Sequence, residues 1–322
     1  MSINSFDNKS YGLAIFAHGT PRSENEFEEF LLSIRRNRPV PTELLNEVKR
    51  RYSVIGGLSP LLKITESFFR KLVDEASTLV VEESAGFKIF ASLGYKHVKP
   101  NIFDAVKELV ESDVSTIFGL IATPYFSPAN IADYYSSAEE SLRKLKKTEI
   151  TFKRMPPLSE IEGYDKLIVK RLQSLLTKIP HLNLDRTLVI FTAHSLPIIA
   201  VQNDNTYQSQ HTNLALSIAQ ECNLKNFRVA YQSGTLGKGD WLSPDINEIV
   251  ISTDPTLVDA VIAVPIGFVS EHAEILYDLD IEVKNNCLLR RINYFRVKMF
   301  NDDEDFINLI SEFIIDFIIT NG

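Results

Sequence analysis

The fold of this chain is decided by the stretch Leu188-Val-Ile-Phe-Thr-Ala-His194-Ser-Leu-Pro197. Its apolar first half predicts a strand that is buried on both faces, as in parallel sheets covered by helices. His194 then lies at the carboxyl end of that strand, and Pro197 ends regular structure soon after. Because ligands of such sheets bind at the carboxyl ends of the strands, His194 is a candidate functional residue. The alternative is a structural histidine held by loop hydrogen bonds.

Similar apolar runs recur along the chain and alternate with longer stretches of helical spacing. The predicted strands are Leu13–Ala17, Phe87–Leu93, Thr116–Ala122, Leu188–Thr192, Phe227–Tyr231 and Ala260–Val264. The predicted helices are Glu24–Ser33, Thr42–Arg51, Pro60–Leu79, Asn101–Glu111, Ala129–Lys146, Tyr164–Thr177, Gln208–Gln220 and 303–319. This alternation predicts an α/β protein with right-handed crossovers between parallel strands.

The length of 322 residues corresponds to about two domains. We predict two similar doubly wound, Rossmann-like domains with parallel sheets and a cleft between them. The N-terminal domain is predicted to comprise residues 10–122 and the C-terminal helix 303–320, and the second domain residues 123–302. The cleft between the domains is the expected binding site.

Composition excludes several classes of protein. The chain has 34 basic and 42 acidic residues, a net charge of -8, so we expect no nucleic-acid partner. Its two cysteines, Cys222 and Cys287, lie far apart, which excludes a cysteine-only iron–sulfur or zinc site within one chain. Met1–Asn8 lacks the apolar segment of a signal peptide, and no apolar run approaches about 18 residues. We therefore expect a cytoplasmic protein without a membrane span.

A second strand-end region carries regularly spaced carboxylates. Glu271, Glu274, Asp278 and Glu282 are three, four and four residues apart, which predicts one acidic face of a helix. Stacked like charges repel, and a helix N-terminus offsets only the first two of them. The pattern therefore favours a hydrated divalent cation or a proton relay, and the alternative is an ordinary solvated acidic face.

The N-terminal region adds a third strand end, which carries a histidine, and a basic run. His18 follows the first predicted strand and precedes Gly19, and it suits a metal ligand, a proton acceptor or a loop strut. Arg35, Arg36 and Arg38 form a basic run in an acidic protein. Guanidinium groups suit planar carboxylates, so a clamp for a small polyanion is the alternative to a solvated face. Together these features predict a cleft in which a metal ion meets an anionic organic ligand.

In these and further segments the chain resembles the ferrochelatase family, most closely its short bacterial branch that acts on coproporphyrin. The matching segments, in chain order, are Gly19-Thr-Pro21, Ile34-Arg-Arg, Arg38-Pro39, Arg51-Tyr52, Ile55-Gly-Gly-x-Ser-Pro60, Lys96-His97, Pro124-x-Phe-Ser127, Thr192-Ala-His-Ser-Leu-Pro197, Tyr231-Gln-Ser233, Trp241-Leu-x-Pro-Asp245 and Pro265-x-Gly-Phe-Val-x-x-His-x-Glu-x-Leu-Tyr-Asp-x-Asp-x-Glu282. The histidine block and the last block are the most specific of these.

The resemblance implies insertion of Fe²⁺ into a porphyrin, with release of two pyrrole protons, in haem synthesis. It implies that His194 and Glu274 are catalytic. The implied metal contacts are His194, Glu274, Asp278, Glu282 and His18, and Lys96 and His97 match an outer metal-contacting position. The implied porphyrin contacts are Arg35, Arg36, Arg51, Tyr52, Ser59 and Tyr134. It also implies no cofactor beyond the substrate iron and no iron–sulfur cluster, and we expect a monomer.

Two positions depart from the family pattern. His18 stands where the bacterial branch usually has tyrosine, so nitrogen replaces oxygen as the potential iron ligand. Glu271 stands where many members have Asp, one methylene shorter. The arginine run favours coproporphyrin, which has four propionates, over protoporphyrin, which has two. Alternatives are a protoporphyrin IX ferrochelatase, a cobalt or sirohydrochlorin chelatase, and a non-catalytic tetrapyrrole carrier, which would not need the pair of His194 and Glu274.

Overall fold

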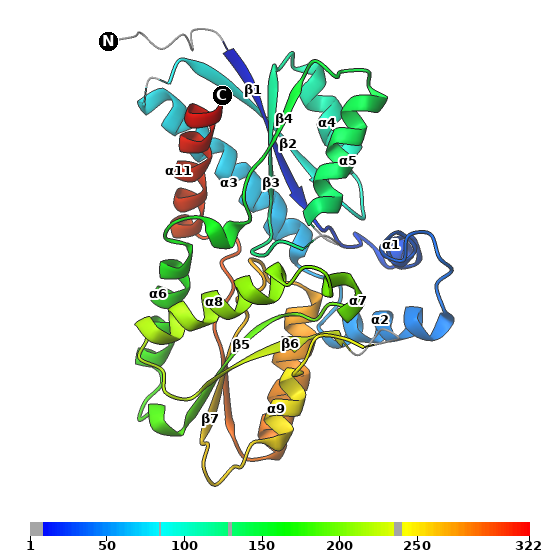
Figure 1. Cartoon of the computed structure of the whole chain (residues 1–322). Helices are drawn as coiled ribbons and strands as arrows, with labels where there is room; N and C mark the ends of the chain where they lie inside the picture. Colours follow the sequence, from blue (N-terminus) through cyan, green and yellow to red (C-terminus); the bar gives the residue numbers. More distant parts are fainter. Residues whose placement is uncertain (1–8, 84, 128–130, 235–239) are drawn as a thin grey trace.

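Two four-stranded parallel sheets form the frame of the molecule, shown in Figure 1. The computed structural model describes residues 9–83, 85–127, 131–234 and 240–322. The first sheet has the order β2-β1-β3-β4, with β1 Lys9–Ala17, β2 Phe87–Tyr95, β3 Thr116–Ile121 and β4 Thr151–Arg154. The second has the order β6-β5-β7-β8, with β5 Thr187–His194, β6 Phe227–Gln232, β7 Ala260–Val264 and β8 Asn293–Arg296. The identical order confirms the predicted pair of similar α/β units.

Helices cover both faces of the first sheet, and two further helices project from it. The covering helices are α3 Leu61–Glu82, α4 Ile102–Glu111, α5 Ile131–Lys144 and the C-terminal α11 Glu304–Asn321, and the projecting ones are α1 Phe27–Ile34 and α2 Thr42–Val54. Figure 1 shows α4 and α5 on one face, and α11 packed along α3 on the other. The segment with α1 and α2 projects from the first unit, and α2 reaches the second unit. We predict that the helix corresponding to α5 starts at residue 129, and this residue lies outside the described residues.

The second unit has helices of its own. They are α6 Tyr164–Lys178, α7 Ile198–Val201, α8 Thr206–Glu221, α9 Ile246–Ser252 and α10 Lys284–Leu289, with a π-helix, η5, at Ile275–Val283. Single 3-10 turns lie at Glu24–Glu26, Leu158–Glu160 and Leu184–Arg186. A π-helix has hydrogen bonds between residues five apart, and such turns occur often at functional sites.

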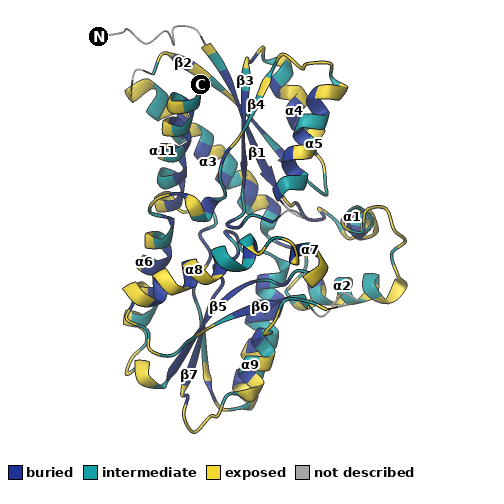
Figure 2. Ribbon diagram, in the orientation of Figure 1, coloured by how far each residue is buried: buried dark blue, intermediate teal, exposed yellow. Residues whose placement is uncertain are grey.

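The central strands are buried on both faces, as their apolar sequences predict. Leu13, Ile15 and Phe16 of β1 and Ile190 and Phe191 of β5 are completely inaccessible to solvent. Figure 2 shows these strands as the buried interior of the molecule, with exposed residues on the outer helix faces. A parallel sheet that is covered on both sides needs such continuous apolar strands.

The edge strands β4 and β8 were not predicted. Their sequences, Thr-Phe-Lys-Arg and Asn-Tyr-Phe-Arg, are half exposed and carry no continuous apolar run. Because β4 pairs with β3, the first sheet extends to Arg154 and includes residues beyond the boundary predicted at 122. The sheet topology therefore moves that boundary toward Met155.

Within the described ranges, no helix is long and apolar enough to cross a membrane. Cys222 and Cys287 are both free and buried.

Candidate active site

The predicted histidines of both units lie where the two sheets face each other. His18 follows the last residue of β1, and His194 is the last residue of β5. These two strands occupy equivalent places in their sheets. The charge of Glu274, in the second unit, is close enough to act on His18 in the first. The structure thus brings His18, His194 and Glu274 to one interdomain site.

His194 and Glu274 form the centre of this site. The Nδ1 atom of His194 lies 2.9 Å from Oε2 of Glu274. His272 approaches the same oxygen, with its Nε2 atom 3.8 Å from Oε2 of Glu274. Both members of the central pair keep part of their surface open, with side-chain exposures of 33% and 41%. The pair can therefore meet a ligand and a solvent-borne proton.

Opposite charges stabilise the ionised forms of this pair. Burial alone would lower the pKa of His194, but the neighbouring Glu274 carboxylate outweighs burial and raises it. Burial alone would raise the pKa of Glu274, but His194 holds it well below its usual range. The imidazole is consequently a stronger proton acceptor than a free histidine.

Glu274, Asp278 and Glu282 form an acidic line that continues from Glu274 along the π-helix η5. A turn of more than four residues keeps Glu274, Asp278 and Glu282 on one face of this helix. The hydroxyl of Ser233 joins the first two, because it lies 3.3 Å from Oε2 of Glu274 and is hydrogen-bonded to Asp278. Ser233 holds this place with a left-handed backbone, φ 67°. The strain of such a conformation is typical of functional sites.

Asp278 is the most deeply buried member of the line, with 2% of its surface exposed. Burial, and then repulsion from Glu274, raises the pKa of Asp278 to about 7. Asp278 is therefore close to half protonated at neutral pH. Because one hydroxyl donates a single hydrogen bond, Ser233 can donate to ionised Asp278 while it accepts from a protonated Glu274, and the bonds reverse once Asp278 holds the proton. This arrangement forms a continuous path for a proton.

The prediction that Glu271 belongs to the same helix face is wrong. The helix begins at Ala273, two residues later, so Glu271 lies in the preceding loop. Its Oε1 atom instead accepts hydrogen bonds from Arg296, at 3.0 Å, and from the amide of Met299, at 3.2 Å. Glu271 thus fixes the loop that leads into the helix.

Arg51 links the acidic line to the projecting segment. Its guanidinium lies 3.2 Å from Oδ1 of Asp278, 2.8 Å from Oε1 of Glu47 and 4.5 Å from the centre of the Tyr277 ring. The sequence resemblance implies that Arg51 contacts the porphyrin. The structure shows it paired with Asp278, where its positive charge compensates part of the carboxylate repulsion.

The first unit supplies the opposite wall of the site. The Nδ1 atom of His18 lies 2.9 Å from the Gly19 carbonyl, so it carries the hydrogen and leaves Nε2 with a free lone pair. The ring of His97 packs against it at a centroid distance of 4.6 Å. Ser33 of α1 holds His97 in turn, through a hydrogen bond of 2.9 Å to Nδ1.

These two histidines are neutral at pH 7. His18 retains exposed surface, yet the protein atoms around it desolvate the ring enough to lower its pKa. Burial, with the neighbouring His18 and Lys96, lowers the pKa of His97 to about 3. A neutral imidazole with a free Nε2 atom is a ready ligand for a transition metal.

The predicted porphyrin contacts fall into two groups. Arg35 and Arg36 lie at the exposed end of α1 and retain polar surface for a carboxylate. Tyr52, Ser59 and Tyr134 are buried. The hydroxyl of Tyr52 bonds to Thr20 at 2.8 Å, Ser59 accepts from the amide of Leu61, and Lys96 covers the Tyr134 ring at 4.7 Å.

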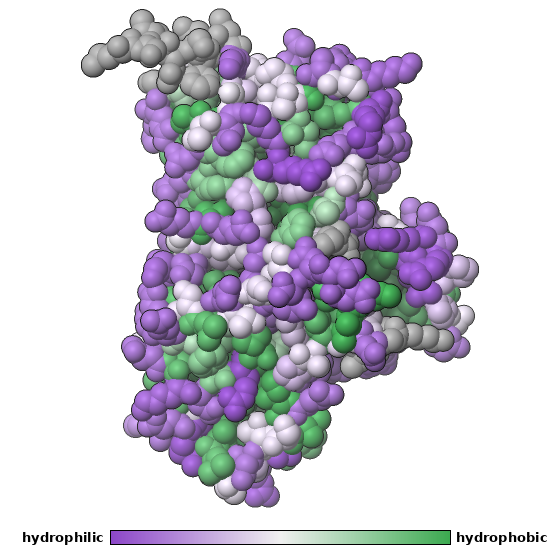
Figure 3. Space-filling model, viewed as in Figure 1, coloured by the Kyte–Doolittle hydropathy of each residue, from purple (hydrophilic) through white to green (hydrophobic). Residues whose placement is uncertain are grey.

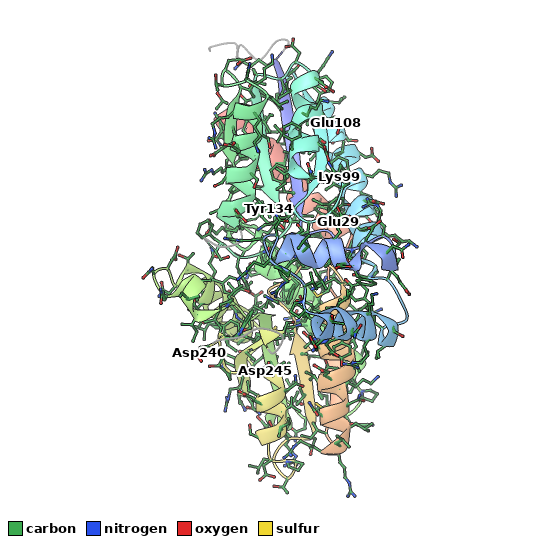
Figure 4. The ribbon with its side chains drawn as sticks, turned by 90° about the vertical axis from the view of Figure 1, so that its right-hand side faces the viewer. Glu29, Lys99, Glu108, Tyr134, Asp240 and Asp245 are labelled. Carbon is green, nitrogen blue, oxygen red and sulfur yellow. The ribbon has the colours of Figure 1, made fainter. Side chains whose placement is uncertain are left out.

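The surface around this site is amphipathic. Exposed apolar residues on the projecting segment and on α7 include Ile34, Val54, Leu58, Ile198 and Ile199. Figure 3 shows apolar surface beside the projecting segment, where it meets the rest of the molecule. Figure 4 views this side directly and labels Tyr134 on the first unit, with Asp240 and Asp245 on the second. Apolar surface with Arg35 and Arg36 beside it suits a flat molecule with carboxylate substituents.

Sequence reasoning missed His272 and Ser233. Both belong to segments of the family resemblance, yet no spacing argument singles them out. Ser233 begins the run Ser233–Gly239, of which residues 235–239 lie outside the described residues. Within the part of the chain that the structure describes, no three His, Cys, Asp or Glu side chains form a group ready to hold a metal ion.

Comparison with known proteins agrees with this geometry. The family model described as Ferrochelatase matches residues 10–317. The coproporphyrin III ferrochelatase of Halalkalibacterium halodurans is 32% identical over 313 residues, which cover 95% of this chain and 96% of the relative. That of Bacillus subtilis is 30% identical over 313 residues, which cover 95% of this chain and 97% of the relative.

Solved structures share the fold at low sequence identity. SirB from Bacillus subtilis with Fe³⁺ has a TM-score of 0.56 and 12% identity, covering 95% of this chain and 94% of that one. The sirohydrochlorin chelatase SirB from Bacillus subtilis subspecies spizizenii, in complex with cobalt, has a TM-score of 0.54 and 11% identity, covering 98% and 97%. At these identities the likeness concerns the fold alone.

Proposed function

Because the chain belongs to the ferrochelatase family, we propose that its interdomain site inserts Fe²⁺ into coproporphyrin III in haem biosynthesis. The observation that carries the residue roles is the pair of His194 and Glu274 at 2.9 Å, at the end of β5. Iron is a substrate here, and we propose that the protein works without a resident cofactor. The reaction consumes Fe²⁺ and the free-base porphyrin and yields the iron porphyrin and two protons.

His194 accepts a pyrrole proton in this proposal. The raised pKa of His194 gives the imidazole the basicity that the transfer needs. A flat macrocycle hides its nitrogen lone pairs, so the site must bend it, and binding of the substituents supplies the energy for that distortion. Arg35 and Arg36, which follow α1, and the apolar surface beside them provide this binding.

The proton then leaves along the acidic line. The proton crosses the Glu274 carboxylate only transiently, because the pKa of that group is low, and Ser233 passes it to Asp278, whose higher pKa lets it hold the proton. Glu282 continues the path on the same helix face. The pKa of about 7 at Asp278 suits a group that both takes up and releases protons at neutral pH. Arg51 limits the negative charge of the line while the proton passes.

His18 acts on the opposite face of the macrocycle. Its free Nε2 atom, fixed by the bond from Nδ1 to Gly19, offers a lone pair to the iron. The neutral state of His18 keeps this lone pair available at pH 7.

The test is an anaerobic insertion assay with Fe²⁺, run in parallel on coproporphyrin III and protoporphyrin IX. We expect metallation of both, with the higher kcat/KM for coproporphyrin. A preference for protoporphyrin would keep the chelatase and refute the substrate proposal. Absence of metallation with both would refute the proposed function in favour of another tetrapyrrole or a carrier.

Arg35→Ala and Arg36→Ala should each weaken the use of coproporphyrin more than that of protoporphyrin. We expect KM for coproporphyrin to rise about five- to tenfold and KM for protoporphyrin to rise by less. Protoporphyrin has two propionates instead of four, so fewer of its carboxylates depend on these arginines. Arg228→Ala is the matched control, since this exposed arginine lies at the start of β6, at the far end of its sheet. Equal losses on both porphyrins would contradict a selective clamp.

A further inference from the structure

The backbone carbonyl of His194 lies at an open position of the second sheet. The amide of Ser195 donates to Gln232 of β6 at 2.7 Å, whereas the carbonyl of Thr192 accepts from the amide of Gly267 at 3.0 Å. Along a strand, the polar groups of successive residues alternate between its two sides. The carbonyl of His194 therefore points to the same side as that of Thr192, where β7 lies.

Tyr207 of α8 occupies this open position. β7 pairs with β5 as far as Phe191 and Val264, and Pro265 follows. Three residues beyond Phe191, the hydroxyl of Tyr207 donates a hydrogen bond of 2.8 Å to the carbonyl of His194. The hydroxyl thus replaces the amide that a longer β7 would supply, and it satisfies a backbone acceptor at the strand end.

Tyr207 is held rigidly in turn. It is 5% exposed, and its ring packs edge-on against Tyr125 at a centroid distance of 5.6 Å. Tyr125 packs on His211 at 5.6 Å, and His211 contacts Tyr231 of β6 at 5.3 Å. Tyr125 follows β3 in the first unit, so this ring cluster joins both units behind His194. A ring packed in this way leaves its hydroxyl little freedom to move.

Close packing of Gly267 against Ala193 also restricts movement of the end of β5. A Cβ atom added at Gly267 would lie 2.4 Å from the Cβ atom of Ala193. The loop after β7 therefore presses directly on the residue before His194. Between this close contact and the Tyr207 hydroxyl, the backbone of His194 is fixed from two directions.

We propose that Tyr207 is a positioning residue for metal insertion, whose hydroxyl holds the end of β5 so that the His194 imidazole stays aligned with Glu274. The proposal rests on the proposed function, because it takes His194 as the proton acceptor. Tyr207 does not touch the reacting atoms and acts through the backbone of His194. A misplacement of about 1 Å in a reacting group costs up to about 10²-fold in rate.

The experiment compares Tyr207→Phe with Tyr125→Phe. Each variant removes one buried hydroxyl from the same ring cluster, but the Tyr125 hydroxyl has no hydrogen-bond partner among the described residues. We expect Tyr207→Phe to lower kcat for iron insertion about tenfold while KM for coproporphyrin changes less than twofold. We expect Tyr125→Phe to leave both constants within twofold of the wild type, and thermal unfolding checks that both variants fold.

Equal kcat values for the two variants, or a loss in Tyr207→Phe confined to KM, would overturn the proposal. His194→Ala, measured beside them, separates this failure from failure of the proposed function. If His194→Ala still inserts iron at the wild-type rate, the role of His194 itself is refuted. If His194→Ala is inactive and Tyr207→Phe is fully active, only the positioning role is refuted.

Discussion

Replacement of His194 by Ala is expected to lower kcat for Fe²⁺ insertion about 10³-fold and to leave porphyrin affinity within a few-fold. The imidazole is the proton acceptor of the proposed reaction, and a positioned base typically contributes about 10²- to 10⁴-fold. Arg35, Arg36 and the apolar surface beside them, which we propose bind the porphyrin, are unchanged in this variant. Insertion is followed by the absorbance of the iron porphyrin under anaerobic conditions, and affinity by quenching of porphyrin fluorescence.

His181→Asn is the control for this variant. His181 is exposed and has a left-handed backbone, φ 57°, which Asn adopts readily. Its replacement should leave both insertion and binding unchanged. A His194→Ala protein that retained wild-type kcat would contradict the proton-acceptor role. A wild-type protein that bound porphyrin without inserting iron, and kept its porphyrin affinity in His194→Ala, would instead be a carrier.

Glu274→Gln is expected to lower kcat about 10²-fold and to move the acid limb of the pH–rate profile to lower pH. In the wild type, Glu274 raises the pKa of His194 above its ordinary 6.5 against the opposing effect of burial. Only the neutral imidazole accepts a proton, so wild-type activity should fall as the pH drops through this raised pKa. Without the Glu274 charge, burial lowers the pKa of His194, and the neutral form persists to lower pH.

Initial rates between about pH 5.5 and 9 test this second prediction. Glu312→Gln, on the exposed side of α11, is a matched control that should keep the wild-type profile. An acid limb that stayed in place in Glu274→Gln would show that another group limits the reaction at low pH. Asp278, with a pKa of about 7, would then be the first candidate.

Strands with continuous apolar sequence were predicted correctly, and strands without it were not. β1, β5 and β7 are covered on both faces, so burial alone selects their residues. β4 and β8 lie at sheet edges, and their pairing depends on the neighbouring strand rather than on their own side chains. The extent of the first sheet could therefore not be read from local sequence, and the boundary at 122 fell too early.

The spacing of the carboxylates correctly predicted that Glu274 and Asp278 share a helix face, but it wrongly included Glu271. Glu274 and Asp278 are four residues apart, and that interval places residues on one face in a π-helix as in an α-helix. Glu271 lies before the helix and pairs instead with Arg296, 25 residues away. The contact between Arg51 and Asp278 joins residues 227 positions apart. Such tertiary pairs determine which side chains face the ligand, and no local pattern records them.

One topology repeated twice gives this molecule two chemically different walls. His18 follows β1 and His194 ends β5, at equivalent places in sheets of the same strand order. Their surroundings set opposite proton affinities, because His18 meets a backbone carbonyl and His97, whereas His194 meets a carboxylate. In the proposed reaction one histidine offers an electron pair to the iron, while its counterpart takes a proton. A repeated scaffold would in this way support an asymmetric reaction.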